Sequence, residues 1–296
     1  MVEKVEDAII VAGGLGTRML PATSAIPKEA LPLVDTPALF HLCWEAIAAG
    51  CTRLHLIVSP AKKELANSLQ EAENIERLMK SRPDLPEIAF CPLPKNIELF
   101  VAVQETARGL GDALSCALPN VKGPFVVLLG DNLIMKTHPS PNNLGIESAS
   151  MASARLVKCW QEHGLPCGGM IQVAEEETCN YGILKMDGDR VVEIVEKPEV
   201  DNAPSRWALC GRYLWPGNAE ELLKRFSLEE FGEMQTIEIQ KNWMQNEGYL
   251  GVDLDDYSWY DSGNPLSWII AQIDHALKRE DLSGPLTAWL KNRLPF

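Results

Sequence analysis

The residues most suited to chemistry begin in a glycine-rich segment near the start of the chain. A short apolar run over residues 8–11 ends at Gly13 and Gly14, and two cations, Arg18 and Lys28, follow. Glycines allow backbone N–H groups to approach a ligand closely, and successive N–H groups in such a turn form an anion-binding nest. An arginine at the edge of that nest adds a planar cation that suits phosphate. The segment therefore predicts a loop that binds phosphate groups.

This loop matches neither of the two common phosphate-binding sequence patterns. The pattern GxxxxGK[ST] is absent, and the glycines do not have the GxGxxG spacing of dinucleotide-binding proteins. For the glycines alone, a turn without a chemical role is the alternative. That alternative weakens because further residues of a binding loop follow in order, namely Arg18, Pro21, Pro27, Lys28 and Glu29.

Two more polar residues come shortly after predicted strands. Residues 97–103 precede Gln104, and residues 124–129 precede a glycine and Asp131. The carboxyl ends of parallel strands line the ligand crevice of open α/β sheets. The Gln104 amide offers a donor and an acceptor, which suits the edge of a pyrimidine, and the Asp131 carboxylate suits Mg²⁺. The alternatives are an ordinary polar loop residue at Gln104 and a turn-capping carboxylate at Asp131.

The second half of the chain contributes further candidates. Glu196 could accept hydrogen bonds from sugar hydroxyls and Lys197 could hold a sugar phosphate, although such a pair alone is a surface feature in most proteins. Gly182 would permit close approach of a sugar. Asp261, in the segment WYDSGN, is either a metal ligand or part of a plain turn. Among the tryptophans, we expect a core or contact-surface position, and no stacking role, for Trp243, Trp259, Trp268 and Trp289.

Strand-like and helix-like patterns alternate along the first half of the chain. This alternation predicts an α/β fold with a mainly parallel sheet flanked by helices, a small β region and a helix-rich C-terminal tail. No repeat, low-complexity tract or linker is evident, so we expect a single domain over residues 1–296. The expected strands are 8–11, 53–58, 97–103, 124–129, a hairpin within 181–198, and 207–215, and the expected helices are 37–49, 61–80, 110–118, a segment up to about 225, 235–246 and 264–292.

Composition argues against several classes of protein. The chain has 41 acidic and 27 basic residues and a formal net charge of −14, which argues against nucleic acid as a partner. No stretch approaches about 18 consecutive apolar residues, so we expect no membrane span and no membrane partner. The first six residues lead directly into a strand and show no signal peptide. We therefore expect a cytoplasmic protein whose eight cysteines are reduced thiols.

The whole opening string, DAIIVAGGLGTRMLPATSAIPKEALPLVDTP over residues 7–37, resembles that of the sugar-1-phosphate nucleotidyltransferases. Within this family it looks most like the bacterial UTP–glucose-1-phosphate uridylyltransferases. Further matching segments follow in the same order, namely VQETARGLGDAL (103–114), VVLLGDNL (126–133), NYGIL (180–184), VEKP (195–198) and WYDSGN (259–264). The chain departs from the family pattern at Ser24, where Lys is usual, and at Asp112, where His is frequent.

The resemblance implies a Rossmann-like nucleotidyltransferase that converts UTP and α-D-glucose 1-phosphate into UDP-glucose and diphosphate. It further implies Mg²⁺ held by Asp131 and Asp261, and a homo-oligomer. It divides the chain into a nucleotide-binding part (about 1–135), a sugar-phosphate-binding part (about 136–263) and a helical tail (about 264–296). Catalytic roles fall to Arg18, Lys28 and Lys197, nucleoside contacts to Gly13, Gly14, Glu29, Gln104 and Gly109, and sugar contacts to Gly182 and Glu196.

Two alternatives to this activity stay open. The nearer one is a sister enzyme that uses dTTP or CTP, or another hexose 1-phosphate. The more distant one is a non-catalytic sensor of sugar nucleotides. A sensor would not need the full set of metal-binding and leaving-group residues, which are present here as Arg18, Lys28, Asp131, Lys197 and Asp261.

Overall fold

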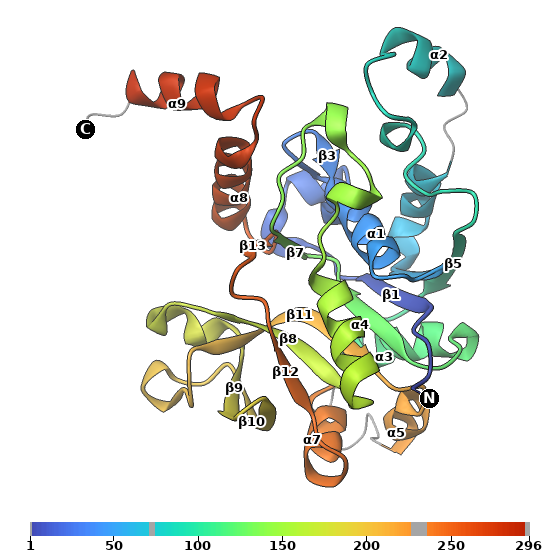
Figure 1. Cartoon of the computed structure of the whole chain (residues 1–296), viewed down its shortest axis with the longest axis vertical. Helices are drawn as coiled ribbons and strands as arrows, with labels where there is room; N and C mark the ends of the chain where they lie inside the picture. Colours follow the sequence, from blue (N-terminus) through green and yellow to red (C-terminus); the bar gives the residue numbers. More distant parts are fainter. Residues whose placement is uncertain (1, 71–74, 226–235, 294–296) are drawn as a thin grey trace.

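The computed structural model describes residues 2–70, 75–225 and 236–293, and a nine-stranded mixed sheet forms its centre within these ranges (Figure 1). The first four strands of the sheet run parallel, and the fifth runs antiparallel to both of its principal neighbours. In spatial order the strands are β5 (Glu98–Val103), β4 (Arg53–Val58), β1 (Asp7–Ala12), β6 (Phe125–Leu129), β11 (Trp207–Trp215), β8 (Cys167–Gln172), β12 (Leu250–Asp253), β10 (Arg190–Glu196) and β9 (Gly182–Asp187).

Helices cover both faces of the parallel strands. Ile10 of β1 belongs to a hydrophobic cluster with α1 (Ala38–Ala48) and α4 (Ala152–His163), whereas its neighbour Ile9 belongs to a second cluster with α3 (Leu110–Ala117). Strands buried on both faces carry apolar runs without polar alternation, as β1, β4 and β6 do. The second cluster also includes residues of α5 (Ala219–Arg225) and α7 (Ile237–Asn246).

These elements confirm the predicted α/β class and most of the predicted segments. The parallel pairings of the first half are joined to a mixed second half, because β11 enters between β6 and β8 in the opposite direction. The expected helical stretch 61–80 consists of the 3₁₀ helix η4 (Pro60–Leu69) and of α2 (Ile75–Ser81). Residues 71–74 of that stretch, and residue 235 of the expected helix 235–246, lie outside the described residues.

A small two-stranded sheet, which the sequence did not predict, joins distant parts of the chain. Strand β7 (Asn132–Met135) pairs antiparallel with β13 (Ser258–Asp261). Their register places Asp261 opposite Asn132, the residue after Asp131. This pairing therefore brings the two predicted metal ligands to one place.

The helix-rich tail is confirmed as α8 (Pro265–Lys278) and α9 (Ser283–Lys291), and α9 extends away from the rest of the chain (Figure 1). The Asn264 side chain caps α8 by accepting a hydrogen bond from the backbone N–H of Ser267 at 3.0 Å. No helix among the described residues is long and apolar enough to cross a membrane. The eight cysteines are free thiols, as predicted.

Three histidines attach α8 to the body of the protein. His275 of α8 lies with its Nδ1 atom 2.9 Å from that of His138, and its ring lies edge-on to that of His41 on α1, 6.3 Å between centroids. Burial lowers the pKa of His41 and of His138 to about 4 and that of His275 to about 3. The nearby cations Lys278 and Arg279 lower these values further, whereas Asp274 opposes the shift for His138 and His275. The folded protein therefore holds all three rings neutral.

We expect the free energy of unfolding to fall as the pH drops from about 6.5 to 4. In that window the unfolded chain takes up protons on these rings and the folded protein does not, so stability is complete above pH 6.5 and decreases below it. The loss is on the order of 3 kcal/mol for each ring, because one pKa unit corresponds to about 1.4 kcal/mol. Urea unfolding at pH 7.5, 5.5 and 4.5 measures it, and His275→Asn is expected to flatten the dependence. The exposed His163 provides the control variant His163→Asn, and an equal slope in all three proteins would contradict the assignment.

Candidate active site

A cavity of about 870 Å³ is lined by residues from both halves of the sheet. Its walls include the end of β6, the β7–β13 pair and the β9–β10 hairpin. The predicted site residues that line it are Arg18, Asp131, Gly182, Glu196, Lys197 and Asp261. The others are not among the lining residues; they follow β1 and β5 in the chain and are described separately below, namely Gly13, Gly14, Lys28, Glu29, Gln104 and Gly109.

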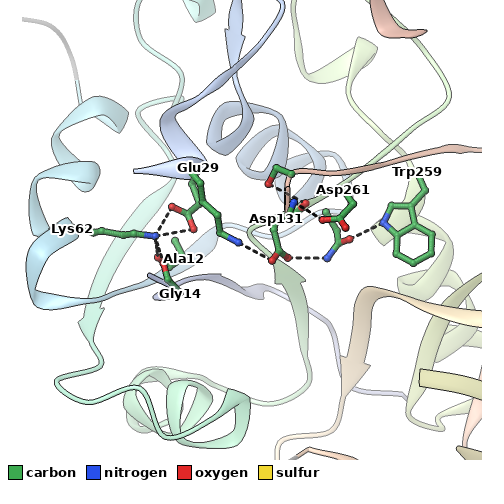
Figure 2. Close-up of polar contacts among 11 residues, drawn as sticks. Ala12, Gly14, Glu29, Lys62, Asp131, Trp259 and Asp261 are labelled. Atoms are coloured by element: carbon green, nitrogen blue, oxygen red, sulfur yellow. Dashed lines mark hydrogen bonds and ion pairs between the residues drawn. The ribbon is translucent and has the colours of Figure 1, made fainter. Parts of the chain in front are cut away.

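The two predicted metal ligands, Asp131 and Asp261, lie close together at the edge of this cavity (Figure 2). The pairing of β7 with β13 continues one residue further, because the backbone N–H of Ser262 donates to the Asp131 carbonyl at 2.8 Å. Burial raises the pKa of Asp261, and the negative charge of Asp131 raises it further, while Arg18 and Lys28 oppose the shift. Two carboxylates that repel each other in one cavity suit a hard cation. Within the described part of the chain, no group of three or more His, Cys, Asp and Glu side chains could hold a metal ion by itself.

Both oxygens of the Asp131 carboxylate have protein partners (Figure 2). Lys28 donates to Oδ2 at 2.7 Å, and the Asn132 side-chain amide donates to Oδ1 at 2.9 Å. The Asn132 amide is itself oriented by Trp259, whose indole N–H donates to the Asn132 Oδ1 atom at 2.6 Å. An indole N–H only donates, so it directs the amide NH₂ of Asn132 toward Asp131. Trp259 is partly buried and packs against the hydrophobic core, as expected, and it also lines the cavity.

Arg18 reaches the same edge of the cavity from the glycine-rich loop. It lies in a short 3₁₀ turn, Thr17–Met19, that follows Gly16 in the left-handed region at φ 67°. The Arg18 Nη2 atom would be 3.1 Å from a Cβ atom added to Gly263. A glycine at position 263 therefore leaves room for the guanidinium beside Asp261. The exposed Arg18 side chain is available to an anion in the cavity.

Glu29, which we expected to contact a nucleoside, is fully buried beneath the loop (Figure 2). Both of its carboxylate oxygens accept hydrogen bonds from Lys62 of η4, at 3.0 and 2.7 Å. The same ammonium group donates to the backbone carbonyls of Ala12 and Gly14. Burial raises the pKa of Glu29 and lowers that of Lys62, and the ion pair opposes both shifts. In this arrangement Glu29 supports the loop through Lys62 and does not present its carboxylate to a ligand.

Sequence reasoning missed Lys62 as part of the site. The residue stands beside Lys63 in a polar segment, which has the appearance of a solvated helix surface. Only the fold shows that Lys62 turns inward to Ala12, Gly14 and Glu29. No local signal in the sequence distinguishes the two lysines.

Gln104 lies at the end of β5 with its amide fully oriented by the protein. Its Nε2 atom donates to the Asp112 carboxylate at 2.8 Å and to the Gly109 carbonyl at 3.2 Å. Its Oε1 atom lies close to Gly13: a Cβ atom added to Gly13 would be 3.1 Å from this oxygen. We expected the NH₂ group of Gln104 to bind a ring carbonyl, but in this structure its two N–H bonds serve Asp112 and Gly109.

The sugar-side candidates come together in the β9–β10 hairpin. Gly182 pairs with Glu196 across the two strands, and a Cβ atom added to Gly182 would lie 3.1 Å from Glu196 Oε2. Lys197 has a positive φ of 45°, and its backbone N–H donates to the Tyr181 carbonyl at 3.0 Å. The Tyr181 ring packs against Trp259 with 4.7 Å between centroids. The exposed Glu196 and Lys197 side chains and this aromatic pair line the cavity together.

Comparisons with known proteins agree with this geometry. Residues 7–276 match the family described as Nucleotidyl transferase. The UTP–glucose-1-phosphate uridylyltransferase of Bacillus subtilis is 30% identical over 299 residues, which cover 99% of this chain and 98% of that protein. A second such enzyme from Staphylococcus saprophyticus is 31% identical over 297 residues, covering 97% of this chain and 98% of that protein.

Solved structures show the same fold. A UDP-glucose pyrophosphorylase from Acinetobacter baumannii superposes with a TM-score of 0.82 at 24% identity, covering 97% of this chain and 99% of that one. A UDP-glucose pyrophosphorylase complexed with UDP-glucose superposes with a TM-score of 0.74 at 25% identity, covering 98% of this chain and all of that one.

Proposed function

Because the chain belongs to the nucleotidyl transferase family, we propose that it transfers the uridylyl group of UTP to glucose 1-phosphate, forming UDP-glucose and diphosphate. The curated relatives carry this activity in their names, and one superposed structure is a complex with UDP-glucose. The observation that carries the proposal is the cavity itself. It brings Asp131, Asp261 and Arg18 together with Glu196 and Lys197 in one lining.

In this reaction an oxygen of the sugar phosphate attacks the α-phosphorus of UTP, and the bond from that phosphorus to the β-phosphate oxygen breaks. The second pKa of a phosphate monoester is about 6, so the attacking group is mostly a dianion at pH 7. No general base is required. Catalysis then consists of aligning the two phosphates and neutralising the charge on the departing diphosphate.

The cations of the site divide between the two phosphates by their positions. Arg18 and Lys28 belong to the loop side, where the triphosphate binds, and Lys197 belongs to the wall that holds the sugar phosphate. The hydroxyl groups of the hexose face Glu196, and the missing side chain of Gly182 leaves room for the ring. The backbones of Gly13, Gly14 and Gly109 with the Gln104 amide hold the nucleoside.

A divalent cation, which we take to be Mg²⁺, fits the pair Asp131 and Asp261. Their facing carboxylates supply two hard oxygen ligands, and phosphate oxygens and water would complete the set. When bound, the ion would neutralise charge on the triphosphate. Lys28 already pairs with Asp131 at 2.7 Å, so its ammonium keeps this carboxylate oriented toward the loop.

We propose the same division for the whole chain: residues of about 1–135 bind the nucleotide, about 136–263 bind the sugar phosphate, and about 264–296 are the tail of a single domain. The cytoplasmic location stays a prediction from the sequence.

We propose that α8 joins two copies of the chain in a homo-oligomer. Its exposed face carries a helical stripe of large apolar residues, namely Leu266, Ile269, Ile270 and Ile273, each at least 40% exposed. Such a stripe suits burial against another helix. Light scattering is expected to give a multiple of the 32.7 kDa chain for the wild type and the chain mass for Ile270→Glu. The charge-matched control Lys291→Gln, at an exposed position of α9, is expected to leave the oligomer intact, and a monomeric wild type would contradict the proposal.

An assay of diphosphate release, run with UTP, dTTP, CTP, ATP and GTP against several hexose 1-phosphates, tests the activity. We expect the highest kcat/KM for UTP with glucose 1-phosphate. The Gln104 carbonyl accepts from uracil and thymine alike, so dTTP is the competing nucleotide that this structure favours most. Tight binding of UDP-glucose without any turnover would instead indicate a sugar-nucleotide sensor.

A further inference from the structure

We propose that Asp112 determines which base this enzyme accepts, by fixing the Gln104 amide in one orientation. The proposal rests on the proposed function, because it takes Gln104 as the residue that reads the base. Asp112 belongs to the first turn of α3 and is buried beneath Gln104, with 6% of its surface exposed. Its side chain therefore acts through Gln104 and makes no contact with the substrate itself.

The hydrogen bonds around Gln104 leave only one amide atom for a ligand. One N–H bond of Nε2 is directed to Asp112 Oδ2 at 2.8 Å and the other to the Gly109 carbonyl at 3.2 Å. The other Asp112 oxygen, Oδ1, accepts from Arg108 Nη2 at 2.8 Å. The Oε1 atom of Gln104 is left beside Gly13, in the loop that follows β1. Gln104 therefore presents an acceptor, and no donor, to the nucleotide.

The Asp112 carboxylate also prevents the amide from turning over. A carboxylate accepts hydrogen bonds and donates none, and the Gly109 carbonyl likewise only accepts. A flipped Gln104 would point its Oε1 atom at both of these acceptors and would leave two buried oxygens, its own Oε1 and Asp112 Oδ2, without donors, which is strongly unfavourable. An asparagine or a histidine at position 112 could donate, so the restriction is specific to the acidic residue.

This fixed acceptor selects among the pyrimidines. Uracil and thymine carry an N–H group at ring position 3, which can donate to the Gln104 carbonyl. Cytosine has an unprotonated nitrogen at that position, and two acceptors would then face each other. A site built around one hydrogen bond rejects the analogue that cannot form it far more strongly than an apolar pocket rejects a change of size. The arrangement therefore admits UTP and dTTP and rejects CTP.

The test compares UTP with CTP in the wild type and in Asp112→Asn. The asparagine can turn its NH₂ toward Gln104 and its oxygen toward Arg108, which lets the Gln104 amide flip and offer a donor to cytosine. We expect the wild type to prefer UTP by a factor of about 10³ in kcat/KM, and the variant to retain a factor of about 10 to 100, with a higher kcat/KM for CTP than the wild type. A structural defect alone would lower both substrates together.

Two further variants show whether Asp112 acts through Gln104. In Gln104→Ala the preference for UTP is expected to fall, and adding Asp112→Asn to it is expected to cause no further change in the UTP/CTP ratio. Leu114→Ala, in the same helix but fully buried in the core, provides the control for a weakened α3 and is expected to keep the wild-type ratio. An unchanged ratio in Asp112→Asn would overturn the inference.

A modified nucleotide tests the same point on the unaltered enzyme. In 3-methyl-UTP the ring N–H is replaced by a methyl group, so we expect a loss in kcat/KM of at least about 10²-fold relative to UTP. Equal use of 3-methyl-UTP and UTP would overturn the role of the Gln104 acceptor, whether or not the Asp112 variants fold. A wild type inactive with every triphosphate would instead contradict the proposed function itself.

Discussion

Replacing Asp131 with asparagine is expected to lower kcat by about 10²- to 10³-fold, with the fold retained. The amide keeps the size of the carboxylate but is a poor ligand for Mg²⁺ and carries no charge. It also leaves Lys28 without its ion pair, since the two groups lie 2.7 Å apart in the structure. Both effects act where charge is neutralised on the triphosphate, so kcat decreases more than the KM of either substrate increases.

The measurement is diphosphate release at saturating UTP and glucose 1-phosphate over a titration with Mg²⁺. Asp201→Asn, at an exposed carboxylate in the short 3₁₀ helix η10 (Val200–Asn202) after β10, is the matched control and is expected to keep wild-type turnover. Thermal unfolding of both variants shows whether the fold is retained. Undiminished activity of the wild type in EDTA, or of Asp131→Asn, would remove the metal role from this carboxylate.

Arg18→Ala is expected to reduce kcat by about 10²- to 10³-fold while changing KM much less. The guanidinium lies at the cavity edge beside Asp261, where the proposed reaction develops charge on the departing diphosphate. Interactions that strengthen only in the transition state affect kcat more than substrate binding. Arg18→Lys should recover part of the loss, because an ammonium keeps the charge but lacks the planar fork.

Steady-state kinetics with both substrates varied distinguishes the possible roles of Arg18. The exposed Arg77, on α2, provides the control variant Arg77→Ala with the same loss of charge. If Arg18→Ala altered only the KM for glucose 1-phosphate, the residue would belong to the sugar-phosphate wall and not to the leaving group.

Local patterns in the sequence were sufficient for the main elements of the fold. The predicted strands 53–58 and 207–215 coincide with β4 and β11. Each is a largely apolar run, and such a run can be recognised locally because it reflects the burial of that strand itself. The helix expected over residues 37–49 begins after Pro37 and ends before Gly50 for similarly local reasons. Local patterns did not predict the order and directions of the strands in the second half of the sheet, since these depend on partners that are distant in the sequence.

The sequence by itself also determined which residue types the site holds. The glycine loop, the cations Arg18 and Lys28 and the carboxylates Asp131 and Asp261 follow from motifs that can be recognised in order along the chain. Such motifs identify chemistry, because phosphate and metal ions require particular donors and acceptors. They do not identify which polar group satisfies which neighbour.

Only the tertiary structure decided those pairings. The register of β7 with β13 brings Asp261 to Asp131, the fold turns Lys62 inward to the buried Glu29, and Asp112 takes the amide N–H that Gln104 was expected to offer a base. In the last two cases the partners are buried polar groups, and each must find a hydrogen bond within the folded protein because water cannot reach it. That requirement is met by whatever residue the packing of distant segments brings within about 3 Å, and no local spacing in the sequence encodes it.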